Sequence, residues 1–250
     1  MYSFCESGHF TVGAVVQLSK AESQHAVRVR RLSRGDGIIL LDGRGARAHA
    51  TIEQPDARAT QVRIDAIDTY ARPQCLIHLA QVIPKGKTMD TIIRQATEIG
   101  VASIQPLISE HSDVRVTGER AISKQNGWRK TAIEACKQCG CPYLPEIHLP
   151  IPWRQFVTQA QHLKQETTWK FIASLEEKAR SIHLQFPDLV SNPREAYCLI
   201  GPEGDFSVQE YMDAQQLGFL PVRLASNVLR CDTAATYTLS ILDNNLNSKN

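Results

Sequence analysis

The chain has 250 residues, of which 42% are hydrophobic and 22% are charged, and its formal net charge is +2. This composition is typical of a soluble globular protein, and it excludes the disordered class, in which hydrophobicity is low and net charge is high. The net charge is too small to produce the strongly positive electrostatic field that would by itself indicate a nucleic-acid-binding protein.

The sequence shows no sign of membrane insertion or secretion. No apolar run reaches the roughly 20 residues of a membrane-spanning helix, and residues 1–10 lack the basic start and apolar stretch of a secretory signal. The seven cysteines are an odd and scattered set, which favours free thiols over a disulfide framework. We therefore expect a cytoplasmic protein with no membrane partner.

The first part of the chain predicts a small β-barrel. Turn signals at Gly35-Asp36 and Asp42-Gly43 separate segments with strand-like alternation. The expected elements are a strand over 11–18, a helix over 23–32, and strands over 37–41, 46–53 and 60–67. Several short strands at this spacing are typical of a barrel. Residues 70–74, with Pro73, form the expected linker, so we expect one domain over 1–72 and another over 73–250.

From residue 75 onward, strands and helices alternate, which is typical of an α/β domain with a parallel sheet and helices on both faces. The expected strands cover residues 75–83, 102–108, 146–149, 168–175, 196–200 and 220–224. The expected helices cover residues 89–100, 128–139, 151–163, 208–217 and 233–246.

Two loops of this second part carry the strongest chemical signal. The strand over 196–200 runs into Gly201-Pro202-Glu203-Gly204, and the strand over 220–224 runs into a polar loop over 225–230. Ser207 and Glu210 have the spacing of a capping box, which predicts a helix start. Strand ends of α/β sheets are where such folds bind small molecules, so we expect a ligand pocket at these two loops.

A basic cluster stands in the first domain. Arg28, Arg30, Arg31 and Arg34 lie within seven residues that contain no acid. Such a cluster suits phosphate binding, because each neutralised phosphate releases counterions. A solvated helix face is the alternative interpretation.

The cysteines at positions 136, 139 and 141, with His148 nearby, raise the question of a zinc site. A structural zinc site needs four ligands in tetrahedral geometry. Cys136 falls with Ala132 and Ala135 on the apolar side of the expected helix, so we interpret it as a core residue and expect no metal.

Several segments resemble the RsmE family of SPOUT-class RNA methyltransferases. IGPEGDFSVQE at 200–210 and LASNVLRCDTAA at 224–235 look like that family's GPEGG-(F/L)-S-x-x-E and LG-x-(R/I/V)-LR-TET loops. KGKTMDTIIRQATEIGV at 85–101, ER at 119–120, WRKTAIEACKQCG at 128–140 and PEI at 145–147 resemble its other motifs, in the same order.

The resemblance implies an enzyme that methylates N3 of a uridine in small-subunit (16S) ribosomal RNA with S-adenosylmethionine (SAM). It further implies a PUA-like RNA-binding β-barrel, a SPOUT domain with a trefoil knot threaded from Leu224 onward, and a homodimer that acts on ribosomal RNA or the assembled small subunit. The residues implied to bind the cofactor are Ser174, Leu175, Ile200, Gly201, Pro202, Gly204, Leu224, Ala225, Asn227 and Leu229. The candidate RNA-binding residues, chosen for their charge, are Arg28, Arg30, Arg31, Arg34, Lys85 and Arg120; Lys87, Arg94 and Arg115 are further basic candidates.

The reaction itself suggests roles for three charged residues. Loss of the N3 proton puts negative charge on the uracil ring, which a nearby cation would stabilise. Arg230 is the candidate cation, with an ion pair to Asp232 as the alternative interpretation. Glu203 and Asp232 are candidates to accept a proton or orient the base, although Glu203 also suits a structural bond to loop amides. The uridine would be unpaired and flipped out.

The sequence departs from the family pattern at four places. Asp205 replaces a glycine, Cys141 and His111 replace arginines, and Cys231-Asp232-Thr233 replaces the TET triplet. Asp205 would be strained if its position requires a positive φ, although aspartate tolerates such angles better than most residues. These departures keep two alternatives open, namely an RNA-binding relative that has lost the chemistry and a SPOUT enzyme that acts on another RNA site.

Overall fold

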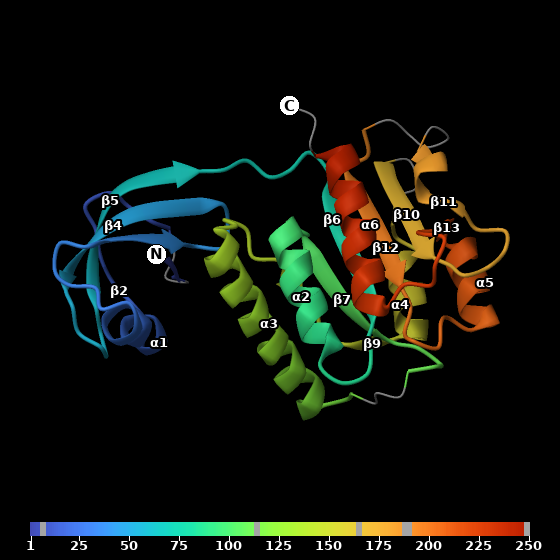
Figure 1. Cartoon of the computed structure of the whole chain (residues 1–250), viewed down its shortest axis with the longest axis horizontal. Coiled ribbons are helices and arrows are strands. Elements are labelled where there is room, and N and C mark those ends of the chain that lie inside the picture. The colour runs from blue at the N-terminus through green and yellow to red at the C-terminus, as the bar shows by residue number, and fades with distance from the viewer. Residues whose placement is uncertain (6–8, 113–115, 164–166, 187–191, 248–250) are drawn as a thin grey trace. The chain divides into compact units, whose positions relative to one another are not determined.

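The computed structural model describes residues 1–5, 9–112, 116–163, 167–186 and 192–247. The chain forms two compact units (Figure 1). The first comprises Met1–Arg72 and Ile133–Leu144, and the second comprises Pro73–Ala132 and Pro145–Asn250.

The first unit is built on a five-stranded sheet of order β1-β3-β4-β5-β2. Its elements are β1 (Tyr2–Phe4), β2 (Val15–Gln17), α1 (Lys20–Gln24), a π-helical turn (His25–Val29), β3 (Gly37–Leu41), β4 (Ala46–Gln54) and β5 (Gln61–Thr69). All pairings are antiparallel except that of β1 with β3. The inward side chains of β3, β4 and β5, including Leu40, Ile52 and Ile64, form one buried cluster.

The helix of this unit differs from the expectation of 23–32. It begins after Ser19, whose hydroxyl accepts a hydrogen bond from the Glu22 amide at 3.2 Å, a typical N-cap interaction. It ends as the π-helical turn, after which Arg31 has a φ of 56°. The expected strand over 11–18 shortens to β2, and β1 carried no sequence signal because three residues are too few to show alternation.

A buried ion pair ties the segment Ile133–Leu144 into this unit. Lys137 Nζ lies 2.7 Å from Glu22 Oε1, and both side chains are about nine-tenths buried. Ser3 Oγ donates a hydrogen bond to the other Glu22 oxygen. The same segment contributes Cys136, which packs against Phe4 and Leu41. Cys136 is therefore a core residue, as its helical position predicted.

The second unit contains an eight-stranded sheet in which every pairing among the described strands is parallel. Its order is β11-β13-β10-β12-β6-β7-β8, with β9 also paired to β7. The strands are β6 (Leu76–Val82), β7 (Ser103–Ile108), β8 (Glu146–Ile147), β9 (Ile151–Pro152), β10 (Thr168–Ala173), β11 (Arg180–Ser181), β12 (Glu195–Ile200) and β13 (Leu220–Arg223). The sequence missed β9 and β11, which have two residues each.

Helices cover both faces of this sheet (Figure 1). They are α2 (Thr88–Ile99), α3 (Glu119–Cys139), whose residues from 133 onward belong to the first unit, α4 (Trp153–Ala160), α5 (Val208–Gln216) and α6 (Cys231–Leu246). Helices α2 and α6 pack together, and α6 contacts β6 and β12. Helices α4 and α5 contribute to a separate core cluster with Ile172 of β10 and Leu199 of β12. Within the described part of the chain, none of these helices combines the length and the apolar character that a membrane span requires.

Two expected helix boundaries have clear physical causes. Gly100 ends α2 with a φ of 93°, the left-handed conformation that glycine adopts at helix ends. Ser207 and Glu210 form the complete capping box that the sequence predicted at the start of α5. Helix α3, in contrast, begins at Glu119, nine residues before the predicted start at 128. The sequence did not predict its first turns because they are polar and show no apolar stripe.

The strand order is the feature that positions the site. Strand β10 lies between β12 and β13, although β12 and β13 both follow it in the chain. Because the three strands are parallel, their carboxyl ends meet at one edge of the sheet. The three loops that leave these ends are therefore neighbours.

A buried lysine joins the segments that follow α4 and α5. Lys170 of β10 is 4% exposed, and its ammonium donates to the carbonyl oxygens of Leu163 and Leu217 at 3.1 and 3.0 Å. These carbonyls follow α4 and α5, where helix ends leave acceptors unpaired. Burial lowers the pKa of this ammonium.

We expect Lys170→Met to lower the free energy of unfolding by about 2 kcal/mol, because the methionine fills the space but leaves both carbonyls without a donor. Urea denaturation measures this change. Lys178→Met, at an exposed lysine, is the control and should stay within about 0.5 kcal/mol of the wild type. Equal stabilities of the two variants would contradict this role of Lys170.

Candidate functional site

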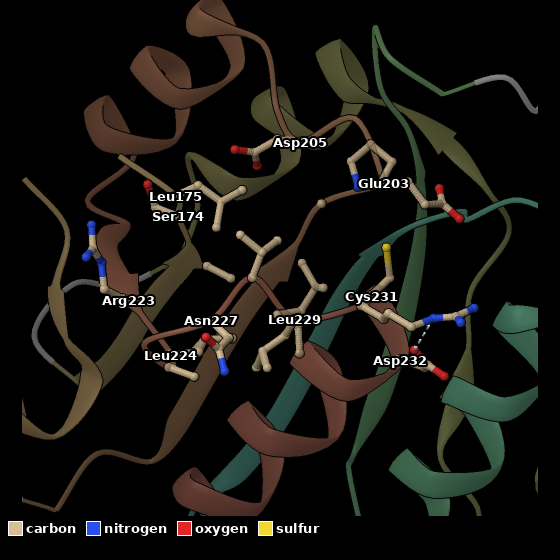
Figure 2. A pocket seen from close by; sticks show the side chains of 18 of the residues that line it. Ser174, Leu175, Glu203, Asp205, Arg223, Leu224, Asn227, Leu229, Cys231 and Asp232 are labelled. Atoms are coloured by element: carbon tan, nitrogen blue, oxygen red, sulfur yellow. Dashed lines mark ion pairs between the residues drawn. The ribbon is translucent and has the colours of Figure 1, made fainter. Parts of the chain in front are cut away.

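The three neighbouring loops enclose a cavity of about 310 Å³ (Figure 2). The residues expected to hold the cofactor line it, with one exception. Those that line it are Ser174, Leu175, Ile200, Gly201, Pro202, Leu224, Ala225, Asn227 and Leu229. Gly204 is the exception, because it faces away toward His111, whose Cβ would lie 3.4 Å from a Cβ built on Gly204.

The loop after β12 is a tight turn held by its own side chains. The Asp205 amide donates to the Pro202 carbonyl at 3.0 Å. Asp205 has a φ of 59°, so the substitution of glycine by aspartate does fall on a left-handed position. Its carboxylate accepts bonds from the Tyr211 hydroxyl at 2.8 Å and from the Phe206 amide at 2.8 Å. These two bonds offset the backbone strain.

Gly201 is required by close packing. A Cβ at this position would lie 3.2 Å from the ring of Phe206, and that ring is itself buried. Since Phe206 belongs to the core cluster behind the loop, a side chain at Gly201 would require this ring or the loop to shift by a few tenths of an ångström.

His111 ties the same turn to the loop after β7. Its Nδ1 donates to the carbonyl oxygens of Gly204 and Asp205, both at 3.1 Å. The bond to the Asp205 carbonyl raises the pKa of the imidazole, and the charges of Glu110 and Glu210 add to this effect. His111 therefore performs a tethering role at a position where the family pattern has an arginine.

The loop after β10 is fixed to β13. The Ser174 amide donates to the Val222 carbonyl at 2.9 Å, and the buried Ser174 hydroxyl accepts from the Glu176 amide at 3.1 Å. Leu175, next in the chain, is 56% exposed. An apolar side chain held open at the cavity is suited to contact the apolar part of a ligand.

The charged end of the cavity is formed by Glu203, Arg230 and Asp232. Figure 2 shows Glu203, Cys231 and Asp232 at the end opposite Ser174 and Arg223. The side chain of Arg230 is 84% exposed, and its Nε lies 3.9 Å from Asp232 Oδ1. Since this distance is too long for a hydrogen bond, the pair leaves the guanidinium available to a ligand.

Two details of this end bear on its chemistry. Asp232 Oδ1 is buried and has no hydrogen-bond partner among the described residues. Burial, with the nearby charge of Glu203, raises the pKa of the Cys231 thiol to about 11, so the thiol stays protonated at neutral pH. Glu203 Oε1 accepts a bond from the Lys85 amide at 3.1 Å, which gives Glu203 a structural bond to the loop after β6.

Comparison with known proteins identifies the family. Residues 71–243 match the model of the RNA methyltransferase domain, and residues 18–65 match that of the RNA methyltransferase PUA domain. The chain belongs to the RsmE family of RNA methyltransferases.

Relatives and solved structures of this family cover the chain almost fully. Ribosomal RNA small subunit methyltransferase E of Aquifex aeolicus is 29% identical, and the alignment covers 93% of this chain and 95% of that enzyme. The same enzyme from Neisseria gonorrhoeae, solved with bound SAM, is 26% identical, covers 100% of this chain and 99% of its own and has a TM-score of 0.88. A Legionella pneumophila protein solved in complex with the cofactor SAM is 32% identical. The match covers 97% of this chain and 96% of that protein, with a TM-score of 0.86.

Sequence reasoning missed several residues that line the cavity. They are Thr88, Ala173, Arg223 and Ala234, and also Asp205 and Cys231, which were noted only as departures. Thr88 opens α2 after β6, the strand beside β12. The rule that ligands lie at strand ends would have found Thr88 if the strand order had been known.

The expected RNA-binding residues are placed in both units. Arg28, Arg30, Arg31 and Arg34 are exposed in the first unit, and Lys85 and Arg120 are exposed in the second. Arg115 lies outside the described residues. Among the described residues, no group of three or more His, Cys, Asp or Glu side chains is arranged to hold a metal ion.

We expect Asp205→Ala to destabilise the protein by about 2 kcal/mol, because it removes two hydrogen bonds and keeps a side chain at positive φ. Asp205→Gly should cost less, since glycine adopts this φ without strain. Chemical denaturation of the two variants measures the difference. If Asp205→Gly proves the less stable of the two, backbone strain at this position is not significant.

Proposed function

We propose that this chain transfers the methyl group of SAM to N3 of a uridine in 16S ribosomal RNA. The observation that carries the proposal is the cavity at three adjacent strand ends, lined by the loops that match the family. Relatives that match over nearly the whole chain are named ribosomal RNA small subunit methyltransferase E, and two similar structures were solved with SAM.

The cavity suits SAM by size and by the kind of groups that line it. Its volume of about 310 Å³ falls in the range of small-molecule sites, about 300–1,000 Å³. Ile200, Leu224 and Leu229 line the cavity, where their main-chain groups would bind the adenine edge, and the Asn227 side chain would bind the polar groups of the ribose or amino acid. SAM supplies an electrophilic methyl group on its sulfonium, so the protein has to bind, align and stabilise charge.

Arg230 stabilises the negative charge that develops on the uracil when its N3 proton leaves. Its exposed guanidinium stands at the rim of the cavity, where an RNA base can reach it. Asp232 accepts the proton or orients the base, since its Oδ1 accepts no hydrogen bond among the described residues and has only the long ion pair to Arg230. Glu203 holds the loop to Lys85 through one oxygen and leaves the other for the same task.

The two parts of the chain divide the work. Residues 1–72 form the RNA-binding domain, which the PUA match supports, and residues 73–250 form the methyltransferase domain. The SPOUT domain carries a trefoil knot threaded from Leu224 onward, and two copies pair as a homodimer. The substrate is ribosomal RNA or the assembled small subunit, in the cytoplasm.

The departures from the family pattern favour an active enzyme over an inactive RNA-binding relative. Asp205 replaces glycine yet bonds to Tyr211, and His111 replaces arginine yet bonds to two carbonyls of the same turn. Asp232 keeps the charge of the glutamate that it replaces. The loop geometry and the charged end are therefore retained.

Cells that lack this protein should lose 3-methyluridine from small-subunit ribosomal RNA, as measured by mass spectrometry of nucleosides. Wild-type protein should restore it, and Arg230→Ala should lower the methylation rate by about 10²–10³-fold, the usual effect of removing a charge-stabilising donor. SAM affinity by calorimetry should stay nearly unchanged, since Arg230 acts on the acceptor. Arg154→Ala, at an exposed arginine of α4, is the matched control.

Two results would remove the proposal. Unchanged 3-methyluridine in the deletion strain excludes the uridine reaction, and a folded protein that does not bind SAM favours the RNA-binding relative. Normal turnover by Arg230→Ala removes that residue from the mechanism.

We expect charge reversal of Arg28 and Arg30 to weaken RNA binding and to flatten its salt dependence, because each lost phosphate contact reduces the number of released counterions. Fluorescence anisotropy over a range of salt concentrations measures both. Arg58→Glu, at an exposed arginine in the loop before β5, is the control. An unaltered salt slope would make the cluster an ordinary solvated surface.

A further inference from the structure

A second cavity, of about 400 Å³, lies in the second unit between the loop after β6, the start of α2 and one face of α3. Its lining residues are Ile83, Pro84, Gly86, Lys87, Met89, Asp90, Lys124, Gly127, Trp128 and Thr131. Lys87 lines this cavity and the next residue, Thr88, lines the first one. The two cavities therefore adjoin at the start of α2.

The floor and the rim of this cavity differ in chemistry. Ile83, Met89 and Trp128 are at most 4% exposed and form an apolar, partly aromatic floor. Lys87, Asp90 and Lys124 are exposed at the rim. Lys124 Nζ lies 5.6 Å from the centre of the Trp128 ring, which holds one ammonium above the floor.

Gly127 keeps the cavity open. It lies in the interior of α3, where glycine lowers helix stability. A Cβ at this position would meet no atom within 4 Å. Packing inside the protein therefore does not require the glycine, whereas entry of a ligand over the helix does benefit from the missing side chain.

We infer that this cavity binds one nucleotide of the RNA substrate, next to the target uridine, and that the base of this nucleotide carries an amino group. The inference rests on the proposed function, because it assigns the occupant from the neighbouring methyl-transfer site. The apolar floor suits a base, and the two lysines suit its phosphates. The Asp90 carboxylate accepts hydrogen bonds only, so it favours the amino group of cytosine, adenine or guanine over uracil, whose one donor, N3–H, is flanked by two carbonyl oxygens that repel a carboxylate.

The first test removes the two positive charges. Lys87→Gln with Lys124→Gln should weaken the binding of single-stranded 16S RNA fragments about tenfold, and should reduce the slope of log K against log salt by about 1.4, since each of the two phosphate contacts contributes roughly 0.7 for single strands. Lys130→Gln, at an exposed lysine of α3 outside the cavity, is the matched control and should change neither quantity. SAM affinity should be the same in all three proteins.

The second test closes the cavity without removing a contact. Gly127→Glu places a carboxylate at the rim and should weaken RNA binding at least as much, while the helix stays folded as judged by circular dichroism. Gly127→Ala adds only a methyl group that meets no protein atom within 4 Å, so it should weaken RNA binding less than Gly127→Glu does. The third test uses cytidine monophosphate and uridine monophosphate as probes. Their binding is monitored by the nuclear magnetic resonance signal of the Trp128 indole N–H. Cytidine monophosphate should shift this signal at lower concentration, and Asp90→Asn should remove the difference.

The outcomes separate this inference from the proposed function. If wild-type protein methylates RNA but the double lysine variant and Gly127→Glu bind RNA normally, the nucleotide site is overturned and the enzyme stands. If RNA binding depends on these residues but no methylation occurs, the site stands and the proposed function falls. If the monophosphates bind in the cavity without competing with RNA, it is a small-molecule site and the inference is wrong.

Discussion

The parallel strand order β13-β10-β12 is the constraint on which the site depends. Two strands that follow β10 in the chain are placed on either side of it, so loops from distant parts of the sequence leave one edge of the sheet together. Neither loop forms a cavity alone, because each supplies only one wall. The arrangement holds only if the strands stay in register, and the cores on both faces of the sheet maintain that register.

Polar bonds to the main chain make the cavity rigid on one side and open on the other. Ser174, Asp205 and His111 fix their loops through hydrogen bonds to backbone groups. Ligand binding therefore loses little conformational entropy from the ordering of these loops. Arg230 is instead exposed and only loosely paired. This difference suits a site in which a small cofactor is held firmly, while a large RNA approaches from solvent.

The sequence predicted the long elements better than the short ones, for physical reasons. Long segments with a clear apolar face, such as α2 and β12, were placed to within a residue or two, because burial on one face leaves a periodic pattern. Two- and three-residue strands such as β1 and β11 leave no such pattern. The loops of the cavity could be recognised from Gly201 to Gly204 and from Leu224 to Arg230, but Thr88 could not, because its place depends on which strands are neighbours.

The departures from the family pattern show how the site accommodates substitution. Asp205 occupies a left-handed position that favours glycine, and its cost is offset because the Tyr211 hydroxyl and the Phe206 amide both donate to its carboxylate at 2.8 Å. His111 bonds to two carbonyls of the same turn, Gly204 and Asp205, so both substitutions act on one structural element. Since the bonds couple these residues, each substitution is best understood together with the other, and the loop geometry is retained although its residues differ.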